Sequence, residues 1–430
     1  MSGTNVVVGG QQNLRDVIDH KESSGFVCDM NHGTCDSSNW KSMDAPAAKT
    51  EIWGVVALGS GNFSVAGKTN GAVTNCIDYR GGEDGFVGAN TADASTCSHF
   101  AGNHNDEGLG MAVGPDYTYV VGTIGKSDHQ DALVVRYDGT DFGVNRTTQG
   151  FSFGGPGLEE IFDVAVGDNE MIYVTGRTSN DLVVWCKSIV GAQCWGADIN
   201  RGDTDLFVAG IHSDAGGMTL SWLYQQEAKY STGQGLAYYT KNAVSNLVVV
   251  GEIDEGIDQS ADPNCLSARD RSDGFKWTNG LVLKFGLDEV GVHSDSLTFD
   301  MRTYGSCTDD AVTVANGETF KSVAIGDTYI FVAGTMRAAG AVCPGTPFFP
   351  HCESNNLEDA VLLALDERDL SIFESYEFVG VDGNDSLDIF FDVAVEGGVV
   401  YMVGATKSIH PNNTLAGGMD AFVVKIDEPN

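Results

Sequence analysis

Acidic residues recur just before several apolar runs of this sequence, and carboxylates are the groups here best suited to chemistry. A hard cation such as Ca²⁺ takes about six to eight oxygen ligands from carboxylates and loop carbonyls. If the runs belong to repeats arranged in a ring, the connections between them place these acids around one opening. The candidate metal ligands are Asp106, Glu107, Asp309, Asp310, Asp382, Asp385 and Asp388, with Glu159 and Glu160 at the same position of another repeat.

The same acids have two other interpretations. They could be solvated turn residues at the beginnings of strands, and we prefer this interpretation to a cation site. Residues 382–388, DGNDSLD, are the nearest approach to a calcium loop, but they lack the glycine and the glutamate of an EF-hand. A pair of carboxylates about 5–10 Å apart would suit glycoside hydrolysis, yet no pair stands out. We therefore expect no cofactor and no catalysis, with bound Ca²⁺ as the alternative.

Ten cysteines occur as close neighbours, and no CxxC motif is present. An even set of this kind indicates disulfides formed in an oxidising compartment. Sequence alone does not fix the connectivity, and pairing of neighbours is the preferred one. The expected pairs are Cys28 with Cys35, Cys76 with Cys97, Cys186 with Cys194, Cys265 with Cys307, and Cys343 with Cys352. Glycosylation sequons at Asn62, Asn145, Asn384 and Asn412 agree with a secreted or cell-surface glycoprotein.

The chain is strongly acidic, with a formal net charge of −36 over 430 residues. Nucleic acid is not an expected partner, because binding it requires clustered lysine and arginine. An anionic membrane surface is disfavoured for the same reason. No apolar run approaches the roughly 18 residues of a membrane span, so we expect no membrane insertion.

Two short strand patterns recur along the whole chain, seven times each. The first is an apolar strand that ends in glycine, and the second is an apolar strand that begins with a polar residue and often with Asp. The glycines are Gly9, Gly67, Gly122, Gly176, Gly251, Gly334 and Gly404. The second pattern begins at Ser24, Asp84, Asp131, Asp205, Asn279, Asp359 and Asp420. β-Branched and aromatic residues fill both patterns, with turn residues between them, as in antiparallel strands.

About four strands in each repeat predict an all-β chain that folds as a single β-propeller of seven blades. We name the strands of a blade A to D from the centre outwards; the glycine pattern is then strand B. The expected blades are blade 1 about 1–50, blade 2 about 51–106, blade 3 about 107–158, blade 4 about 159–232, blade 5 about 233–317, blade 6 about 318–386 and blade 7 about 387–430. Six blades with a projecting N-terminal segment are the alternative.

The succession DVAV, YVTG and DAFVVK in these repeats resembles the SBBP-type repeats of secreted β-propellers. The resemblance covers nearly the whole chain loosely, and blades 4 and 5 carry insertions. It implies a propeller fold and an extracellular location, and it implies no reaction.

The first and last blades are expected to be incomplete, because blade 1 shows no A strand and blade 7 no D strand. Unpaired strand edges are templates for another chain. We therefore expect a non-catalytic, extracellular structural or adhesive subunit of a surface assembly or fibril, whose partners are copies of itself, other extracellular proteins or glycans. The alternatives are a cation-dependent propeller that binds glycans or proteins and, less favoured, a glycan-active enzyme.

Overall fold

The structure is a computed structural model, and it groups the chain into two compact units. Unit 1 comprises Met1–Asp198 and Phe207–Gln225, and unit 2 comprises Ile199–Leu206 and Gln226–Asn430. The residues that the structure describes are 7–13, 23–29, 40–43, 49–59, 62–72, 76–77, 82–91, 94–100, 104–125, 129–139, 142, 148–168, 171–196, 204–226, 228, 230–253, 278–288, 290–293, 299–304, 319–337, 358–378, 388–406 and 420–429.

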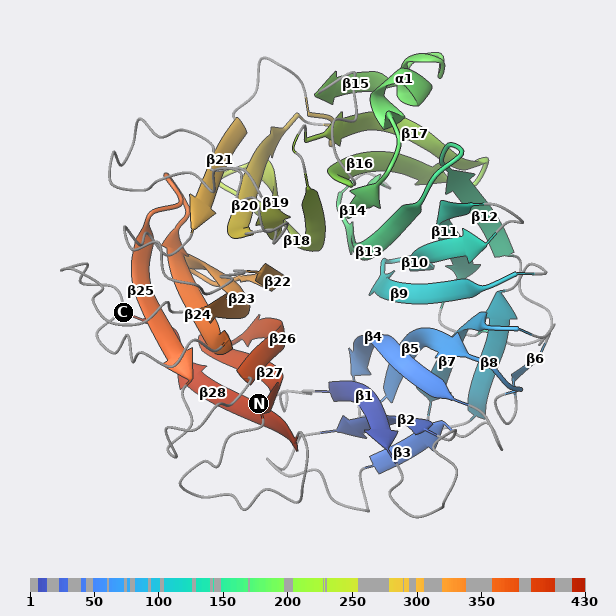
Figure 1. Cartoon of the computed structure of the whole chain (residues 1–430), viewed down its shortest axis with the longest axis horizontal. Coiled ribbons are helices and arrows are strands. Elements are labelled where there is room, and N and C mark those ends of the chain that lie inside the picture. Colours follow the sequence, from blue (N-terminus) through green and yellow to red (C-terminus); the bar gives the residue numbers. More distant parts are fainter. Residues whose placement is uncertain are drawn as a thin grey trace, which may run out of the picture. The chain divides into compact units, whose positions relative to one another are not determined.

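Unit 1 contains four sheets, whose strands are labelled in Figure 1. The first sheet is β1 (Val7–Asn13), β2 (Ser23–Asp29) and β3 (Trp40–Met43). The second is β4 (Thr50–Gly59), β5 (Asn62–Thr69), β7 (Asp84–Thr91), β8 (Ala94–Phe100) and β6 (Cys76–Ile77). The third is β9 (Asp106–Val113), β10 (Tyr117–Gly125), β11 (Gln130–Asp138) and β12 (Thr148–Phe153). The fourth is β13 (Glu159–Val166), β14 (Met171–Thr178), β16 (Asp205–Asp214), β17 (Gly217–Gln225) and β15 (Gln193–Gly196), with the short helix α1 (Leu182–Lys187) beside it.

Unit 2 contains three sheets, shown in yellow-green to red in Figure 1. The first is β18 (Ser231–Lys241), β19 (Val244–Ile253), β20 (Asn279–Leu287) and β21 (Phe299–Tyr304). The second is β22 (Thr319–Ile325), β23 (Tyr329–Arg337), β24 (Glu358–Asp366) and β25 (Ile372–Phe378). The last is β26 (Asp388–Glu396), β27 (Val399–Thr406) and β28 (Asp420–Asp427).

The prediction of an all-β propeller with antiparallel four-stranded blades is confirmed. Five sheets contain strands A to D in order, and the first and last contain three strands among the described residues. The predicted count of seven blades is not confirmed, because the structure corresponds to a propeller of six blades. Within each unit, neighbouring sheets pack through apolar faces; for example, Phe331 and Leu362 of one sheet share a core with Phe390 and Met402 of the next.

The repeat glycine lies within its B strand, two or three residues before the end of β5, β10 and β14, and a β-bulge in the neighbouring A strand explains it. The pairing of β10 with β9 shifts register at Gly122, and a Cβ there would overlap the carbonyl oxygen of Glu107. A bulge bends its strand and turns a backbone group out of the ladder. The same overlap occurs at Gly67, Gly176, Gly251, Gly334 and Gly404. The repeat glycine is therefore required for close backbone approach.

The bulge also corrects the predicted position of the acids. We placed Asp106, Glu107 and Asp388 in connections before the A strands, and this is wrong, because Asp106 begins β9 and Asp388 begins β26. Glu159 and Glu160 likewise begin β13. The extra residue of a bulge interrupts the two-residue alternation of side chains. The sequence pattern therefore fades at the bulge, although each strand continues for several residues on its N-terminal side.

Candidate functional site

The first acid of each of these A strands is buried and fastens the strand within its own blade. Asp106 is fully buried, and its Oδ1 accepts a hydrogen bond from the Gly125 amide at 2.8 Å. Asp388 is also fully buried and accepts one from the Thr406 hydroxyl at 2.5 Å. Burying a carboxylate is costly unless it is hydrogen-bonded, and both residues meet that condition. Their positions are therefore structural.

Glu159 occupies the same position in β13 and has three donors. Its Oε1 accepts from the Thr178 hydroxyl at 3.0 Å and from the Asn180 amide, and its Oε2 accepts from the Gly155 amide at 3.1 Å. Burial raises the pKa of Glu159, these hydrogen bonds oppose the rise, and the neighbouring charge of Asp131 adds to it. Asp131 begins the C-strand pattern of the preceding blade, so an acid pair spans the joint between two blades.

A second acid pair has the same construction in unit 2. Asp359 lies near the start of the C strand β24, and Asp388 begins the A strand of the next blade. Burial raises the pKa of Asp359 to about 6, and the charge of Asp388 contributes to the shift. A carboxyl group in this position keeps its proton to a higher pH than an exposed aspartate. At each of these two blade joints, burial and a neighbouring carboxylate raise the pKa of one acid, Glu159 or Asp359.

The second acid of the A strands in unit 1 is ion-paired. Glu107 Oε1 lies 2.8 Å from Lys68 Nζ, and Glu51 lies 3.6 Å from the same nitrogen. Although burial lowers it, the hydrogen bond and charge of Glu107 raise the pKa of Lys68 overall. Glu160 pairs with Arg177 in the next blade of this unit. These carboxylates therefore form ion pairs with basic side chains of the neighbouring B strands.

The predicted cation ligands therefore divide into two sets. Asp106, Glu107 and Asp388 each have a protein partner. The other four, Asp309, Asp310, Asp382 and Asp385, lie outside the described residues. Within the described part of the chain, no group of three or more His, Cys, Asp or Glu residues is placed to hold a metal ion.

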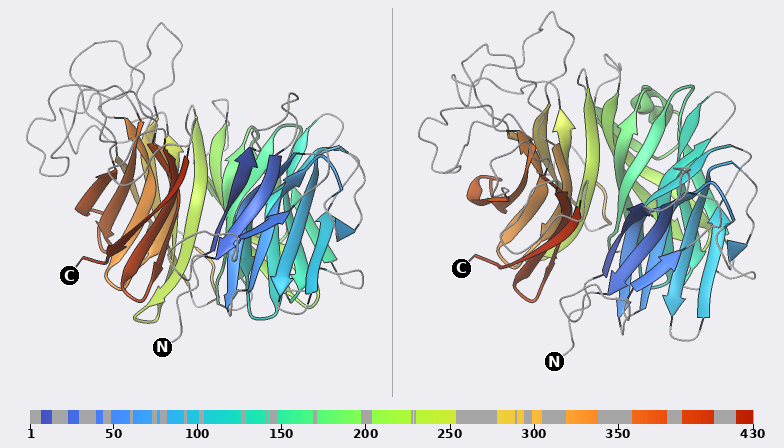
Figure 2. Two further views of the ribbon diagram at one scale, coloured as in Figure 1. Left: turned by 90° about the horizontal axis from the view of Figure 1, so that it is seen from below. Right: turned by 60° about the horizontal axis from the view of Figure 1, so that its bottom comes forward.

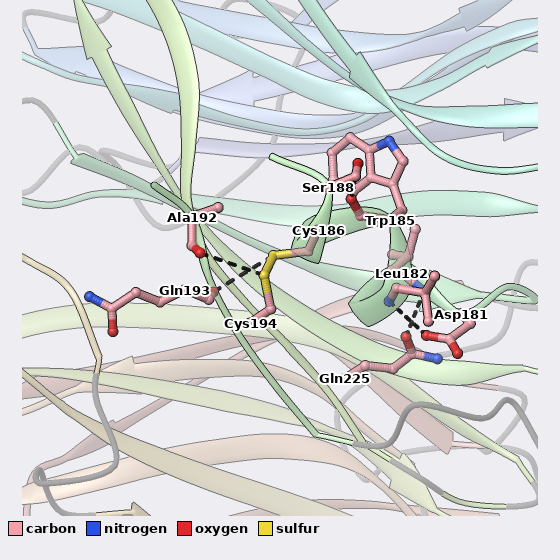
Figure 3. Close-up of a disulfide and its surroundings, with 10 residues drawn as sticks. Asp181, Leu182, Trp185, Cys186, Ser188, Ala192, Gln193, Cys194 and Gln225 are labelled. Carbon is pink, nitrogen blue, oxygen red and sulfur yellow. Dashed lines mark hydrogen bonds between the residues drawn. A yellow bond between two sulfur atoms is a disulfide. The ribbon is translucent and has the colours of Figure 1, made fainter. Parts of the chain in front are cut away.

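Two of the predicted disulfides are present: Cys76–Cys97 and Cys186–Cys194, and this pairing is confirmed. Figure 3 shows the second, which joins α1 to β15. Asp181 caps α1 by accepting a hydrogen bond from the Val184 amide at 2.9 Å, and the Leu182 amide donates to Gln225 of β17 at 2.8 Å. The other predicted pairs (Cys28–Cys35, Cys265–Cys307 and Cys343–Cys352) cannot be compared, because nothing is described of these side chains.

Both disulfides hold an extra strand at the outer edge of a blade, a feature that the sequence did not predict. The strand β6 pairs parallel with the D strand β8, and β15 pairs parallel with the D strand β17. Each extra strand comes from the segment between strands B and C of its blade. This segment covers the unpaired backbone groups of an outer edge, where another chain could otherwise pair.

The two tryptophans that flank the Cys186–Cys194 disulfide pack onto their blade, and one glycosylation sequon lies in a described strand. Trp185 stacks on Phe153 with ring centroids 5.5 Å apart, and Trp195 lies 6.1 Å from Trp222, so both pack onto the blade. The sequon residue Asn62 begins β5. The sequons at Asn145, Asn384 and Asn412 lie outside the described residues.

The last sheet ends on a strand that differs from the outer strands of the five sheets that contain strands A to D. Its outermost described strand is β28, the red strand that leads to the C label in Figure 2. In the preceding blades the C strands β11, β20 and β24 are apolar and almost wholly buried. β28 has the same sequence type, but Ala421, Lys425 and Asp427 are exposed and Val423 is 37% exposed.

The outer edges of five other sheets carry polar residues or a covering strand. The D strands β12, β21 and β25 contain polar residues, among them Gln149, Asp300 and Glu374. The sheets of β8 and β17 add a disulfide-held fifth strand. Polar residues and covering segments are common ways of keeping an edge from pairing with another chain. The edge of β28 has no covering strand among the described residues, and it is the candidate functional site.

A comparison with protein-family models and with curated proteins found no match to this chain. The resemblance to SBBP-type repeats therefore stays a prediction. The described residues include no helix that is both long and apolar enough to cross a membrane.

Proposed function

We propose that this chain is a non-catalytic, extracellular structural or adhesive propeller that assembles with other proteins through a strand edge. The observation that supports this proposal is the apolar C-type strand β28 at the edge of the last sheet. Backbone pairing at such an edge supplies affinity, and alternate side chains supply specificity. The two disulfides are consistent with an oxidising compartment, where structural subunits of cell surfaces are found.

Self-association over a range of protein concentrations tests the proposal. We expect sedimentation to show species that grow with concentration, and negative-stain images to show contacts that repeat from particle to particle. Val423→Lys places a charge on the proposed edge and should shift assembly to higher concentration. Val290→Lys is the matched control, because Val290 is 60% exposed in the turn after β20, away from the edge of β28. Single particles at every concentration, or equal assembly of both variants, would contradict self-assembly through this edge.

A further inference from the structure

Three D strands of this chain share a pattern of residues at alternate positions. Each contains a hydrogen-bond acceptor, a long or aromatic residue two positions later, and an aromatic residue two positions after that. The sets are Gln149, Phe151 and Phe153 in β12; Asp300, Arg302 and Tyr304 in β21; and Glu374, Tyr376 and Phe378 in β25. Since alternate residues of a strand share one face, each set lies on one side of its sheet.

The aromatic residue that ends the pattern always lies opposite a small residue of the C strand. Phe153 pairs with Ala132, and Tyr304 pairs with Gly280. The third pair is Phe378 with Ala360. The rings of Phe153 and Tyr304 are buried, with 2% and 9% exposure. In the blade of Tyr304, the ring of Phe320 from the next blade lies over Gly280 and packs 5.6 Å from the Tyr304 ring.

The acceptor that begins the pattern of the D strand pairs with a C-strand residue that lies four positions after the small residue. In two of the three blades the residue opposite is basic: Arg136 faces Gln149, and Lys284 faces Asp300. The Arg136 guanidinium donates to Gln149 Oε1 at 2.7 Å. In the third blade Ala364 faces Glu374, so the base is not required for strand pairing. Arg136 thus adds a cross-strand polar contact, whereas the Lys284 ammonium donates to the Glu367 carbonyl oxygen at 2.6 Å.

β28 has the same residues at the same positions of the C strand. Ala421 occupies the small position, Val423 lies two residues further, and Lys425 occupies the basic position. Ala421 and Lys425 are exposed, and the Lys425 ammonium lies 5.7 Å from the ring of Tyr401 on the neighbouring strand. The small residue that would receive an aromatic ring, Ala421, and the basic residue that would contact an acceptor, Lys425, are thus both accessible; we call the surface at Ala421 the seat.

We propose that β28 binds an extended segment of a partner protein as an antiparallel strand. The segment carries an acidic residue opposite Lys425, a long or aromatic residue opposite Val423 and an aromatic residue opposite Ala421. This inference rests on the proposed function, and it specifies the chemistry of the partner. The chain's own strand β25, IFESYEF, is a ready probe with this pattern.

Binding of a labelled peptide with the sequence of residues 372–378 to the full chain is the test. The control peptide exchanges Glu374 and Phe378, which keeps its composition and breaks its pattern. We expect saturable binding by fluorescence anisotropy, at least about tenfold weaker for the control because an aromatic contact and its burial are lost. Hydrogen exchange should slow at the backbone amides of β28 when the first peptide is bound.

Two variants of the chain locate the binding site. Ala421→Phe fills the seat and should abolish binding. Lys425→Glu should weaken binding about two- to fivefold, and a Glu374→Lys peptide should restore it, as expected for a cross-strand charge pair. Val290→Lys should bind as the unaltered chain does, and thermal unfolding should show that all variants fold.

The outcomes separate this inference from the proposed function. Absence of peptide binding, equal binding of the two peptides, or protection confined to other strands overturns the inference. If the chain still assembles in those cases, assembly proceeds through another surface or another sequence pattern. If the peptide binds as expected and the chain does not assemble, self-assembly is overturned, and the partner segment belongs to another protein.

Discussion

Replacing Gly122 by alanine tests the structural reason for the repeat glycine. A Cβ at this position of β10 would overlap the carbonyl oxygen of Glu107, which the bulge in β9 turns toward it. Overpacking costs about 1–3 kcal/mol, and the upper part of this range applies because the obstacle is backbone. Alanine also reduces the freedom of the unfolded chain, which offsets about 0.4–1 kcal/mol. We therefore expect a net loss of about 2 kcal/mol in the free energy of unfolding.

Gly150 in the same sheet provides the control. It lies in β12, and a Cβ there would meet no atom within 4 Å. Gly150→Ala should leave the free energy of unfolding unchanged or raise it by up to about 1 kcal/mol. Urea unfolding, with hydrogen exchange of the amides of β9–β12, measures both variants. Equal stability of Gly122→Ala and Gly150→Ala would refute the bulge explanation.

Three further predictions concern blade joints and edges. Burial and the charge of Asp388 raise the pKa of Asp359 to about 6. Because this pKa lies above that of the unfolded chain, the free energy that protonated Asp359 adds to folding is fully present below about pH 4 and is lost as pH rises through 6. Asp359→Asn should therefore stabilise the fold at pH 7, by about 1 kcal/mol after allowance for solvent screening, and leave the Tm nearly unchanged at pH 4; equal shifts at both pH values would contradict this. Arg136 is buried and donates to Ser213 at 2.9 Å in the next blade, so Arg136→Met should cost about 2–4 kcal/mol in thermal unfolding, and an unchanged Tm would exclude this role. The disulfides Cys76–Cys97 and Cys186–Cys194 span 21 and 8 residues, so replacing each pair by serine should cost about 3.4 and about 2.6 kcal/mol; the reverse order would mean that loop entropy does not decide their effect.

The strands of this fold could be predicted because their residues repeat. Apolar runs that begin at Trp53, Gly110, Phe162, Leu236, Phe320 and Phe390 predict A strands, and each overlaps an observed strand. The segments that begin at Thr219 and Ser296 predict D strands, and they overlap β17 and β21. Each of these predictions depended on β-branched and aromatic alternation, which packing on both faces of a blade requires.

The position of the acids could not be predicted, because it depends on bulges and on contacts between distant segments. Asp106 and Asp388 precede a break in the alternation, and such a break also marks the end of a strand. Only the pairing of Gly122 with Gly108, and of Gly404 with Phe390, shows that the A strands continue through it. The sequence showed that a glycine recurs in every B strand. The structure gives the reason, which is that a carbonyl oxygen of the A strand lies where a Cβ would be.

The extra strands β6 and β15 were hidden for a different reason. They contain two and four residues, too few for any pattern, and each is held at its edge by a disulfide. The cysteine spacing did predict the pairs, and it was the available signal that these insertions are ordered. The spacing of the cysteines could not show that part of each insertion pairs with the D strand of its own blade.

The outer edge of β28 is notable because the outer edges of five other sheets are protected. A single exposed apolar strand is common on protein surfaces and needs no explanation. Here, however, the D strands β12, β21 and β25 each contain several polar residues, and the edges of β8 and β17 are covered. The outermost described strand of the last sheet, DAFVVKID, has the residue types of the C strands that are buried on both faces in other blades. The residues at Ala421 and Lys425 match those that receive a D strand elsewhere in the chain, so the edge of β28 has the chemistry of a binding site for a strand.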